Sequence, residues 1–93
     1  MQIHWANMQE IRPEQREKVE GRLSDLADGR SDLIDVRIHG RTNNHHRHGG
    51  CEVTIACQAR GKDLVASRSR PELSLALVEA LAAFEREVRT LRD

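Results

Sequence analysis

Three arginines near the end of the chain have a spacing suited to phosphate binding. Arg86, Arg89 and Arg92 recur at steps of three, which places them on one side of a helix in its last two turns. Guanidinium groups make charge-assisted hydrogen bonds to phosphate oxygens, so the three side chains could together contact a nucleic-acid backbone. The helix dipole also favours cations at a C-terminus, so the same pattern is typical of an ordinary solvated helix end.

The histidines are the residues with a potential for metal binding. His45, His46 and His48 lie close in the sequence to Cys51. Structural zinc sites use four tetrahedral ligands from spaced pairs, whereas these histidines are crowded into a glycine-rich segment. The spacing favours a solvated loop over a metal site, and we predict no bound metal and no cofactor.

A nucleophilic catalytic site would need a thiol beside a base. Cys57 is the candidate thiol, and His39 and His4 are the candidate bases. Alternation along the strand that contains Cys57 points its side chain into the core, whereas both histidines occupy polar positions. No phosphate-binding loop or acid and base pair accompanies them, so the sequence predicts neither an enzyme nor a small-molecule substrate.

The composition is that of one small globular domain spanning residues 1–93. Hydrophobic residues make up 38% of the chain and aromatic residues only 2%, so the core must be aliphatic. The chain has 15 basic and 15 acidic residues, and its net charge is formally zero. This balance excludes a chain-wide basic field, so a polyanionic partner would have to bind a local patch.

The cysteines and the N-terminal residues indicate a cytoplasmic protein. Cys51 and Cys57 lie on one predicted strand, roughly 20 Å apart at the rise of a strand, which is too far for a disulfide. No export leader and no membrane-spanning run is visible in the sequence. Two inward-facing thiols fit a reducing compartment.

The clearest structural signal is a pair of strands followed by a long helix. A turn over residues 60–62 joins the strands, and in the second strand, over 63–67, either Leu64 and Ala66 or Val65 and Ser67 face inward. The buried face of the first strand would hold every second residue: Cys51, Val53, Ile55, Cys57 and Ala59.

The long helix is predicted to start with a capping box. Ser69 would cap it, with Glu72 three residues on and Pro71 in the first turn. Leu75 and Val78 fall outside its apolar stripe. That stripe recurs at steps of three and four and would cover the sheet: Leu73, Leu77, Ala80, Leu81, Phe84, Val88 and Leu91.

The first half of the chain is predicted to form a strand, a helix and a second strand. The strand covers residues 2–5, and the helix begins with Pro13 and ends before Gly29, with a mixed to acidic outer face. The second strand covers 33–39, and 40–50 forms a polar hairpin tip. Inward-facing residues are Val19, Leu23 and Leu26 of the helix and Ile34, Val36 and Ile38 of the strand.

These elements predict an α+β two-layer sandwich of order β-α-β-β-β-α. A strand-helix-strand unit places its strands side by side and parallel, and the later hairpins complete a four-stranded mixed sheet. Both helices must cover the one apolar face. The opposite face would be open to solvent and carries Asp35, Arg37, His39, Glu52, Thr54 and Gln58.

The order of elements and several local strings resemble the ribosome hibernation-promoting factor and ribosome-associated inhibitor family, also called sigma-54 modulation proteins, in its short form. The resemblance covers essentially the whole chain. The matching strings are Ile11-Arg12-Pro13, Arg16-Glu17, Val19-Glu20 and Arg22-Leu23 in the first helix, Cys51-Glu52-Val53-Thr54-Ile55 in the third strand, and Glu72-Leu73, Ala76-Leu77 and Glu85-Arg86 at the second helix. It implies a sheet with two helices on one face, similar to double-stranded RNA-binding domains.

The resemblance also implies a function, a partner and a set of RNA-binding positions. Members of the family bind ribosomal RNA on the small ribosomal subunit and occlude the channel of messenger and transfer RNA, by steric exclusion, during dormancy or stress. The positions that match are Arg16 and Arg22 on the first helix, Arg60 and Lys62 at the strand turn, and Arg86, Arg89 and Arg92 on the second helix.

An alternative function is a protein-binding or weakly homodimerising module of the same fold that has lost RNA binding. The neutral net charge and the acidic outer face of the first helix favour this alternative, as do Leu75 and Val78 outside the core stripe.

Overall fold

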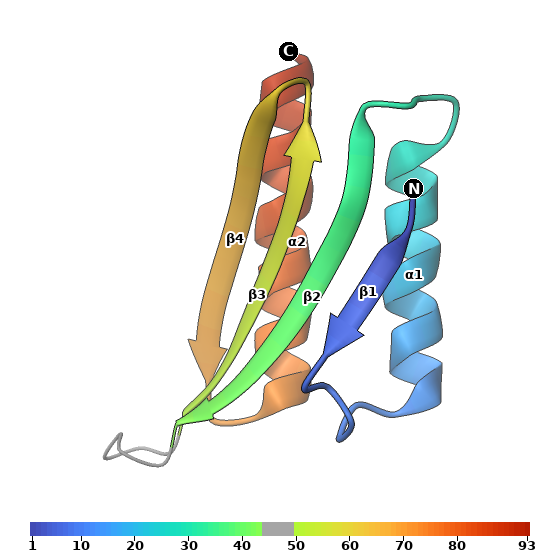
Figure 1. Ribbon diagram of the computed structural model, residues 1–93. Coiled ribbons are helices and arrows are strands. Elements are labelled where there is room, and N and C mark those ends of the chain that lie inside the picture. The colour runs from blue at the N-terminus through green and yellow to red at the C-terminus, as the bar shows by residue number, and fades with distance from the viewer. Residues whose placement is uncertain (44–49) are drawn as a thin grey trace.

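The structure is a computed structural model that describes residues 1–43 and 50–93 (Figure 1). The chain follows the predicted order of elements: β1 (Ile3–Ala6), α1 (Pro13–Ala27), β2 (Leu33–Asn43), β3 (Gly50–Ala59), β4 (Lys62–Arg70) and α2 (Leu73–Arg92). The strands form one sheet in the order β1-β2-β3-β4. β1 is parallel to β2, and the other two pairings are antiparallel.

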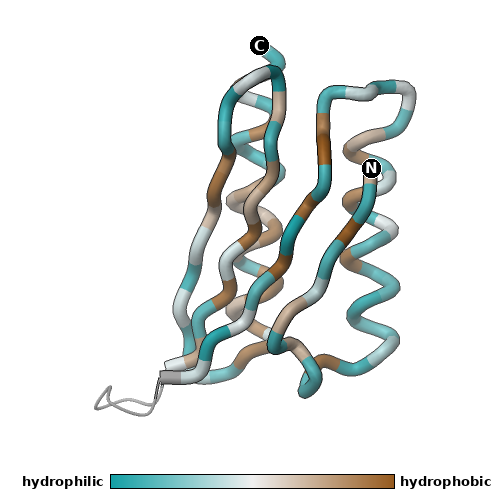
Figure 2. The backbone as a smooth tube through the Cα atoms, viewed as in Figure 1, coloured by the Kyte–Doolittle hydropathy of each residue, from teal (hydrophilic) through white to brown (hydrophobic). Residues whose placement is uncertain are grey.

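Both helices cover the same face of the sheet (Figure 1). One continuous core joins them to the strands, with Val36, Ile38, Val53 and Ile55 fully buried from the sheet and Leu77 from α2. Figure 2 shows the alternation of apolar and polar residues along the strands that produces this one-sided burial. The predicted α+β two-layer sandwich is therefore confirmed.

The predicted ends of the first helix are also confirmed. Pro13 occupies the first turn of α1, where its missing N–H costs no helical hydrogen bond. Gly29, which follows the C-terminal cap Asp28, has a φ of 69°. That left-handed conformation is one that glycine adopts without steric penalty.

The first half of β2 departs from the predicted alternation. Ile34 was predicted to face inward, but it is 54% exposed, and the neighbouring Leu33 is buried instead. The register with β3 shifts between Ile34 and Arg37, and Asp35 has a φ of 41°. A bulge of this kind adds a residue to one strand and reverses the facing of every residue before it.

The start of α2 also differs from the prediction. β4 continues to Arg70, so Ser69 pairs with Glu52 of β3 and does not cap the helix. The residue at the N-cap is Glu72, and its side chain makes no capping hydrogen bond. Continuing the ladder with β3 satisfies several backbone groups at once, whereas a cap satisfies one or two.

Burial in β4 decides between its two predicted facings, and the pairing of β2 with β3 corrects the length of the predicted loop. Ala66 is buried and Val65 is 52% exposed, so of the two predicted facings the one with Leu64 and Ala66 inward is correct. The predicted loop over 40–50 is too long, because Asn43 still pairs with Gly50. The histidines of the predicted metal set, His45, His46 and His48, lie outside the described residues.

Gly40 allows the loop after β1 to cross close over β2. It is buried, and a Cβ atom at this position would lie only 2.6 Å from the Asn7 carbonyl oxygen and would also collide with Met8. Backbone cannot move aside as a side chain can, so a larger residue would displace the loop and the buried Met8 side chain.

We predict that Gly40→Ala lowers the free energy of unfolding by about 1–3 kcal/mol, because it overpacks this crossing. The matched control is Gly21→Ala on the solvent side of α1, where nothing lies within 4 Å of the added Cβ. This control should raise stability by roughly 0.5–1 kcal/mol, since alanine is the better helix former. Thermal and urea unfolding measure both changes, and a shift of stability in the same direction in the two variants would contradict the prediction.

Candidate nucleic-acid interface

A groove between α1 and α2 is the main concave feature near the predicted RNA-binding residues. Its first half has an apolar floor of Val19, Val78 and Leu81 and a rim that includes Arg12 and Lys18. The helices are bridged at one end by Gln15, whose Nε2 donates to the Ser74 carbonyl oxygen at 3.1 Å. The groove therefore combines an apolar floor with cations and one carboxylate, Glu14, along the edge that α1 supplies.

The second half of the groove contains three of the predicted cations. Arg22, Arg89 and Arg92 line it, and Arg30 adds a fourth cation. Carboxylates share this part of the groove: Asp25, Asp28 and Glu85. The structure thus brings together Arg22 of α1 and the arginines of α2, which lie more than sixty residues later in the sequence.

Arg22 crosses the groove and forms an ion pair with Glu85 of α2. Glu85 is 6% exposed and is the one buried charged residue in the described part of the chain. A carboxylate without a partner is costly to bury, so Arg22 supports the packing of α2 against α1. The side chain of Arg22 nevertheless stays 49% exposed, which leaves part of the guanidinium facing solvent.

Arg92 holds the end of α2 against the segment between α1 and β2. Its Nε and Nη2 donate to the two carboxylate oxygens of Asp32 at 2.8 and 2.9 Å. Both side chains are almost buried, at 11% and 10% exposure. The hydrogen bonds from Arg92 lower the pKa of Asp32 below its ordinary value of 3.8, and Arg60 adds to the lowering. The same pair raises the pKa of Arg92.

Arg60 and Lys62 lie at the turn between β3 and β4, which Figure 1 shows at the same end of the molecule as the C-terminus of α2. Arg60 has a φ of 54° and precedes Gly61, so the turn directs the chain back sharply into β4. Arg60, Lys62, Arg86 and Arg89 are exposed, with no ion pair to another described residue.

Arg16 lies apart from the residues that line the groove. Its guanidinium lies 5.1 Å from the centre of the Trp5 ring on β1, and its Nη2 donates to the Met8 carbonyl oxygen at 2.9 Å. Trp5 in turn donates from Nε1 to Glu20 of α1 at 3.0 Å. A guanidinium over an aromatic ring is stabilised by cation–π attraction, so Arg16 helps to fix α1 to the edge of the sheet.

Sequence reasoning missed three cations that line the groove: Arg12, Lys18 and Arg30. A signal was present for the first two, because Arg12 and Lys18 flank the core stripe of α1 and so face its neighbour. Arg30 follows the helix, and no periodic pattern fixes where its side chain lies.

The candidate nucleophile lies where the alternation predicted. Cys57 is 2% exposed, and burial raises the pKa of its thiol. His39 is exposed on the opposite face of the sheet, where its Nε2 lies 3.3 Å from Asn7 Nδ2. A buried, protonated thiol without a neighbouring base is a poor nucleophile. Both cysteines are free thiols, as their separation along β3 predicted.

Residues 1–43 and 50–93 contain no group of three or more His, Cys, Asp or Glu side chains placed to hold a metal ion. In the same ranges, neither helix is long and apolar enough to cross a membrane.

Fold and groove together define a small α+β module with a groove between two helices that both cations and carboxylates line. No family model and no curated protein matches the chain. Its fold is shared with a ribosomal subunit interface protein from Coxiella burnetii, at a TM-score of 0.76 and 16% identity over 99% of this chain and 98% of that chain. It is also shared with the N-terminal domain of Protein Y from Thermus thermophilus, at a TM-score of 0.70 and 15% identity over 98% and 97% of the two chains. The fold that the family resemblance implied is confirmed.

We predict that Asp32→Asn destabilises the protein by about 1–2 kcal/mol at neutral pH, because the carboxylate that holds Arg92 is lost. The folded-state pKa of Asp32 is lowered, so its stabilising contribution is present above pH 3.8 and is lost as the pH falls through that lowered value. The difference between wild type and variant should therefore shrink in urea unfolding below pH 3.8.

The control for this prediction is Asp25→Asn, which removes an exposed carboxylate from the same part of the groove. It should change stability by less than about 0.5 kcal/mol. A constant difference between wild type and Asp32→Asn as the pH falls below 3.8 would show that the carboxylate charge does not stabilise the fold.

Proposed function

We propose that this chain is a ribosome-associated translation inhibitor of the hibernation-promoting factor family, without enzymatic activity. The observation that carries the proposal is the likeness of fold along nearly the whole chain to a ribosomal subunit interface protein. The arginines of the groove, which carboxylates share, and the four exposed cations at the C-terminal end of α2 and the β3–β4 turn support an RNA partner. Such a protein acts in the cytoplasm, where the ribosomes are.

The proposed partner is the small ribosomal subunit, bound through 16S ribosomal RNA. Phosphates of structured RNA would be contacted by exposed cations, and the fit would depend on the shape of the RNA more than on its base sequence. The bound domain would then exclude messenger and transfer RNA from their channel by its volume. This mechanism needs no chemical step, so it requires neither a cofactor nor a small-molecule substrate.

The predicted RNA-binding residues divide into two roles in this proposal. Arg86, Arg89, Arg60 and Lys62 are exposed and would contact phosphates directly. Arg22 would contribute through its exposed half. Arg16 and Arg92 are bound within the fold, so they would act mainly by positioning α1 and α2.

We predict that Arg86→Glu with Arg89→Glu weakens co-sedimentation with isolated small subunits at least roughly tenfold at low salt, since two phosphate contacts become repulsive. Wild-type binding should fall between low and near-physiological salt, with a logarithmic slope of roughly −3 for four phosphate contacts. Arg92 is left unchanged because its loss would disturb the fold.

The charge-matched control is Arg37→Glu with Arg41→Glu, which makes the same change of charge on the open face of the sheet. It should leave binding within about threefold of wild type. Equal losses in both double variants would place the contact elsewhere or make it nonspecific. Absence of the wild-type chain from small subunits at low salt would refute the proposal.

A second candidate function is protein binding, and the apolar part of the groove favours it. Val78 lines the groove and is 46% exposed, and Leu75, one turn before it, is equally exposed. Under the first proposal, Leu75→Ser with Val78→Ser should leave ribosome binding unchanged. If the wild type does not bind ribosomes but self-associates in sedimentation velocity, and this variant does not, the second function holds.

A further inference from the structure

β4 forms one edge of the sheet and is long enough to attract another strand. It lies last in the order β1-β2-β3-β4, so on one of its sides no strand of residues 1–43 or 50–93 is its neighbour. It contains nine residues, whereas β1 at the other edge contains four. The unpaired amide and carbonyl groups of an edge strand can add a strand from a second molecule unless something blocks them.

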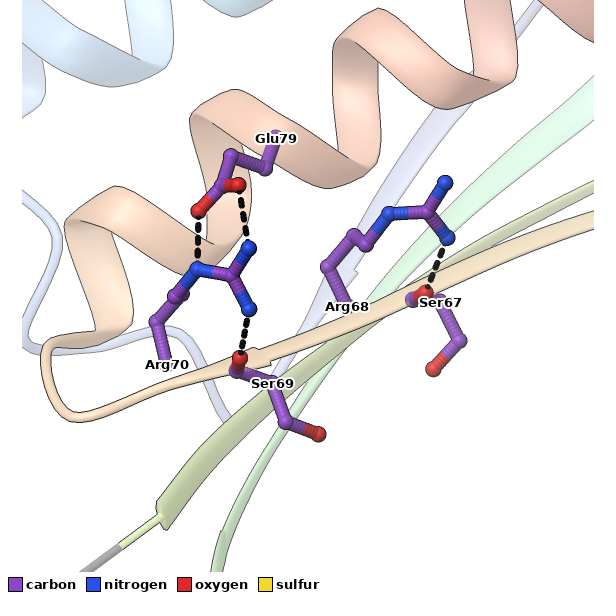
Figure 3. A network of polar contacts seen from close by, with 5 residues as sticks. All are labelled: Ser67, Arg68, Ser69, Arg70 and Glu79. Carbon is purple, nitrogen blue, oxygen red and sulfur yellow. Dashed lines mark hydrogen bonds and ion pairs between the residues drawn. The ribbon is translucent and has the colours of Figure 1, made fainter.

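Two arginines of β4 bind backbone carbonyl groups of the same strand (Figure 3). Arg68 donates from Nη1 to the Ser67 carbonyl oxygen, and Arg70 donates from Nη1 to the Ser69 carbonyl oxygen, each at 2.7 Å. Residues two apart in a strand direct their carbonyl groups to the same side. Ala59 and Lys62 flank the two-residue turn and form a hydrogen-bonded pair with β3, and such pairs alternate along an antiparallel ladder. Ser67 and Ser69 fall on the intervening pairs, so their carbonyls point away from β3 to the free edge.

Arg70 is held in this position by α2. Its Nε lies 2.5 Å from Oε2 of Glu79, and its Nη2 donates to Oε1 at 2.6 Å. Figure 3 shows the guanidinium of Arg70 between the Glu79 carboxylate and the Ser69 carbonyl. A bidentate carboxylate pair fixes the plane of a guanidinium, so Arg70 covers the carbonyl with little freedom to leave it.

A second β4 strand is the partner that this edge fits best. In an antiparallel pairing centred on Ala66, the two strands overlap over all nine residues, and the buried Ala66 meets its own copy. Odd-numbered residues then face odd-numbered residues, so both sheets keep their apolar face on the same side. In this register Lys62 lies opposite Arg70 of the second copy, and the like charges repel.

We propose that Arg68 and Arg70 close the free edge of β4 against pairing with β4 of a second copy of this chain. They do so by occupying the carbonyl acceptors of Ser67 and Ser69 and by placing positive charge opposite Lys62. Without these two arginines, β4 of one molecule would pair with β4 of a second copy across a two-fold axis. This pairing uses the long free edge of each molecule, so the assembly ends at a dimer. This inference is independent of ribosome binding.

The test is Arg68→Thr with Arg70→Thr, because threonine suits a strand but cannot reach back to the carbonyl groups. In sedimentation velocity the variant should dimerise at concentrations at which wild type is monomeric. Hydrogen exchange of the Val65, Ser67 and Ser69 amides should slow on the order of tenfold from low to high protein concentration, as these amides become paired. The same amides of the wild type should show no concentration dependence.

The control is Arg37→Thr with Arg41→Thr, which removes the same charge from β2, a strand already paired on both sides. It should remain monomeric. Glu79→Gln leaves the sequence of β4 unchanged and loosens only the anchor of Arg70. It should therefore dimerise more than the wild type and less than the double variant, and it tests the proposal even if the double variant misfolds. The proposal is overturned if the Arg68→Thr, Arg70→Thr variant and the Glu79→Gln variant both remain monomeric with unchanged hydrogen exchange. It is also overturned if the control dimerises equally, or if the wild type already pairs through β4.

Discussion

The structure depends on covering one apolar sheet face with aliphatic side chains. The chain has a single phenylalanine, Phe84, which is fully buried, and its one tryptophan is half-buried at the sheet edge. Leucine, valine, isoleucine and alanine must therefore supply the remaining burial, and one helix cannot cover four strands. α2 packs over β3 and β4, and α1 covers the rest of the same face. The groove between the helices is a consequence of this division, and polar side chains bridge it.

The parts of the fold that follow directly from sequence are those in which burial is strictly periodic. Alternation from Val53 to Ala59 and the stripe of α2 are local signals, and the structure confirms both. The errors fall where a nonlocal pairing outweighs a local preference. Asp35 takes a left-handed conformation within a bulge opposite β3, and Ser69 stays in the ladder when its sequence context favours a helix cap. Nothing in residues 33–39 alone distinguishes a bulged strand from a regular one.

The residue types of the candidate site were predictable from the sequence, but which of the side chains form ion pairs within the fold was not. A helical repeat of arginines is visible in the sequence, and the family resemblance supplied further positions on α1 and at the turn. Neither reveals that Arg92 is bound to Asp32 or that Arg22 is bound to Glu85, because these partners are separated by 60 and 63 residues. Such pairings exist only once both helices are docked, so they distinguish cations that hold the fold together from cations that remain exposed.

Neutral net charge does not argue against a polyanionic partner for this molecule. The ion pairs of Arg22, Arg70 and Arg92 join equal numbers of positive and negative side chains, and only the pair of Arg92 with Asp32 is withdrawn from the surface. Exposed charges of both signs remain at each end of a molecule 41 Å long. The β3–β4 turn and the end of α2 carry Arg60, Lys62, Arg86 and Arg89 together with Asp63 and Glu87, and the first half of α1 carries Glu14 and Glu17 with Lys18. At physiological ionic strength charges are screened over about 8 Å, so the two regions act almost independently. A phosphate group therefore responds to the cations within its reach and not to the net charge of the chain, so a neutral chain can still offer the local contacts that RNA binding would require.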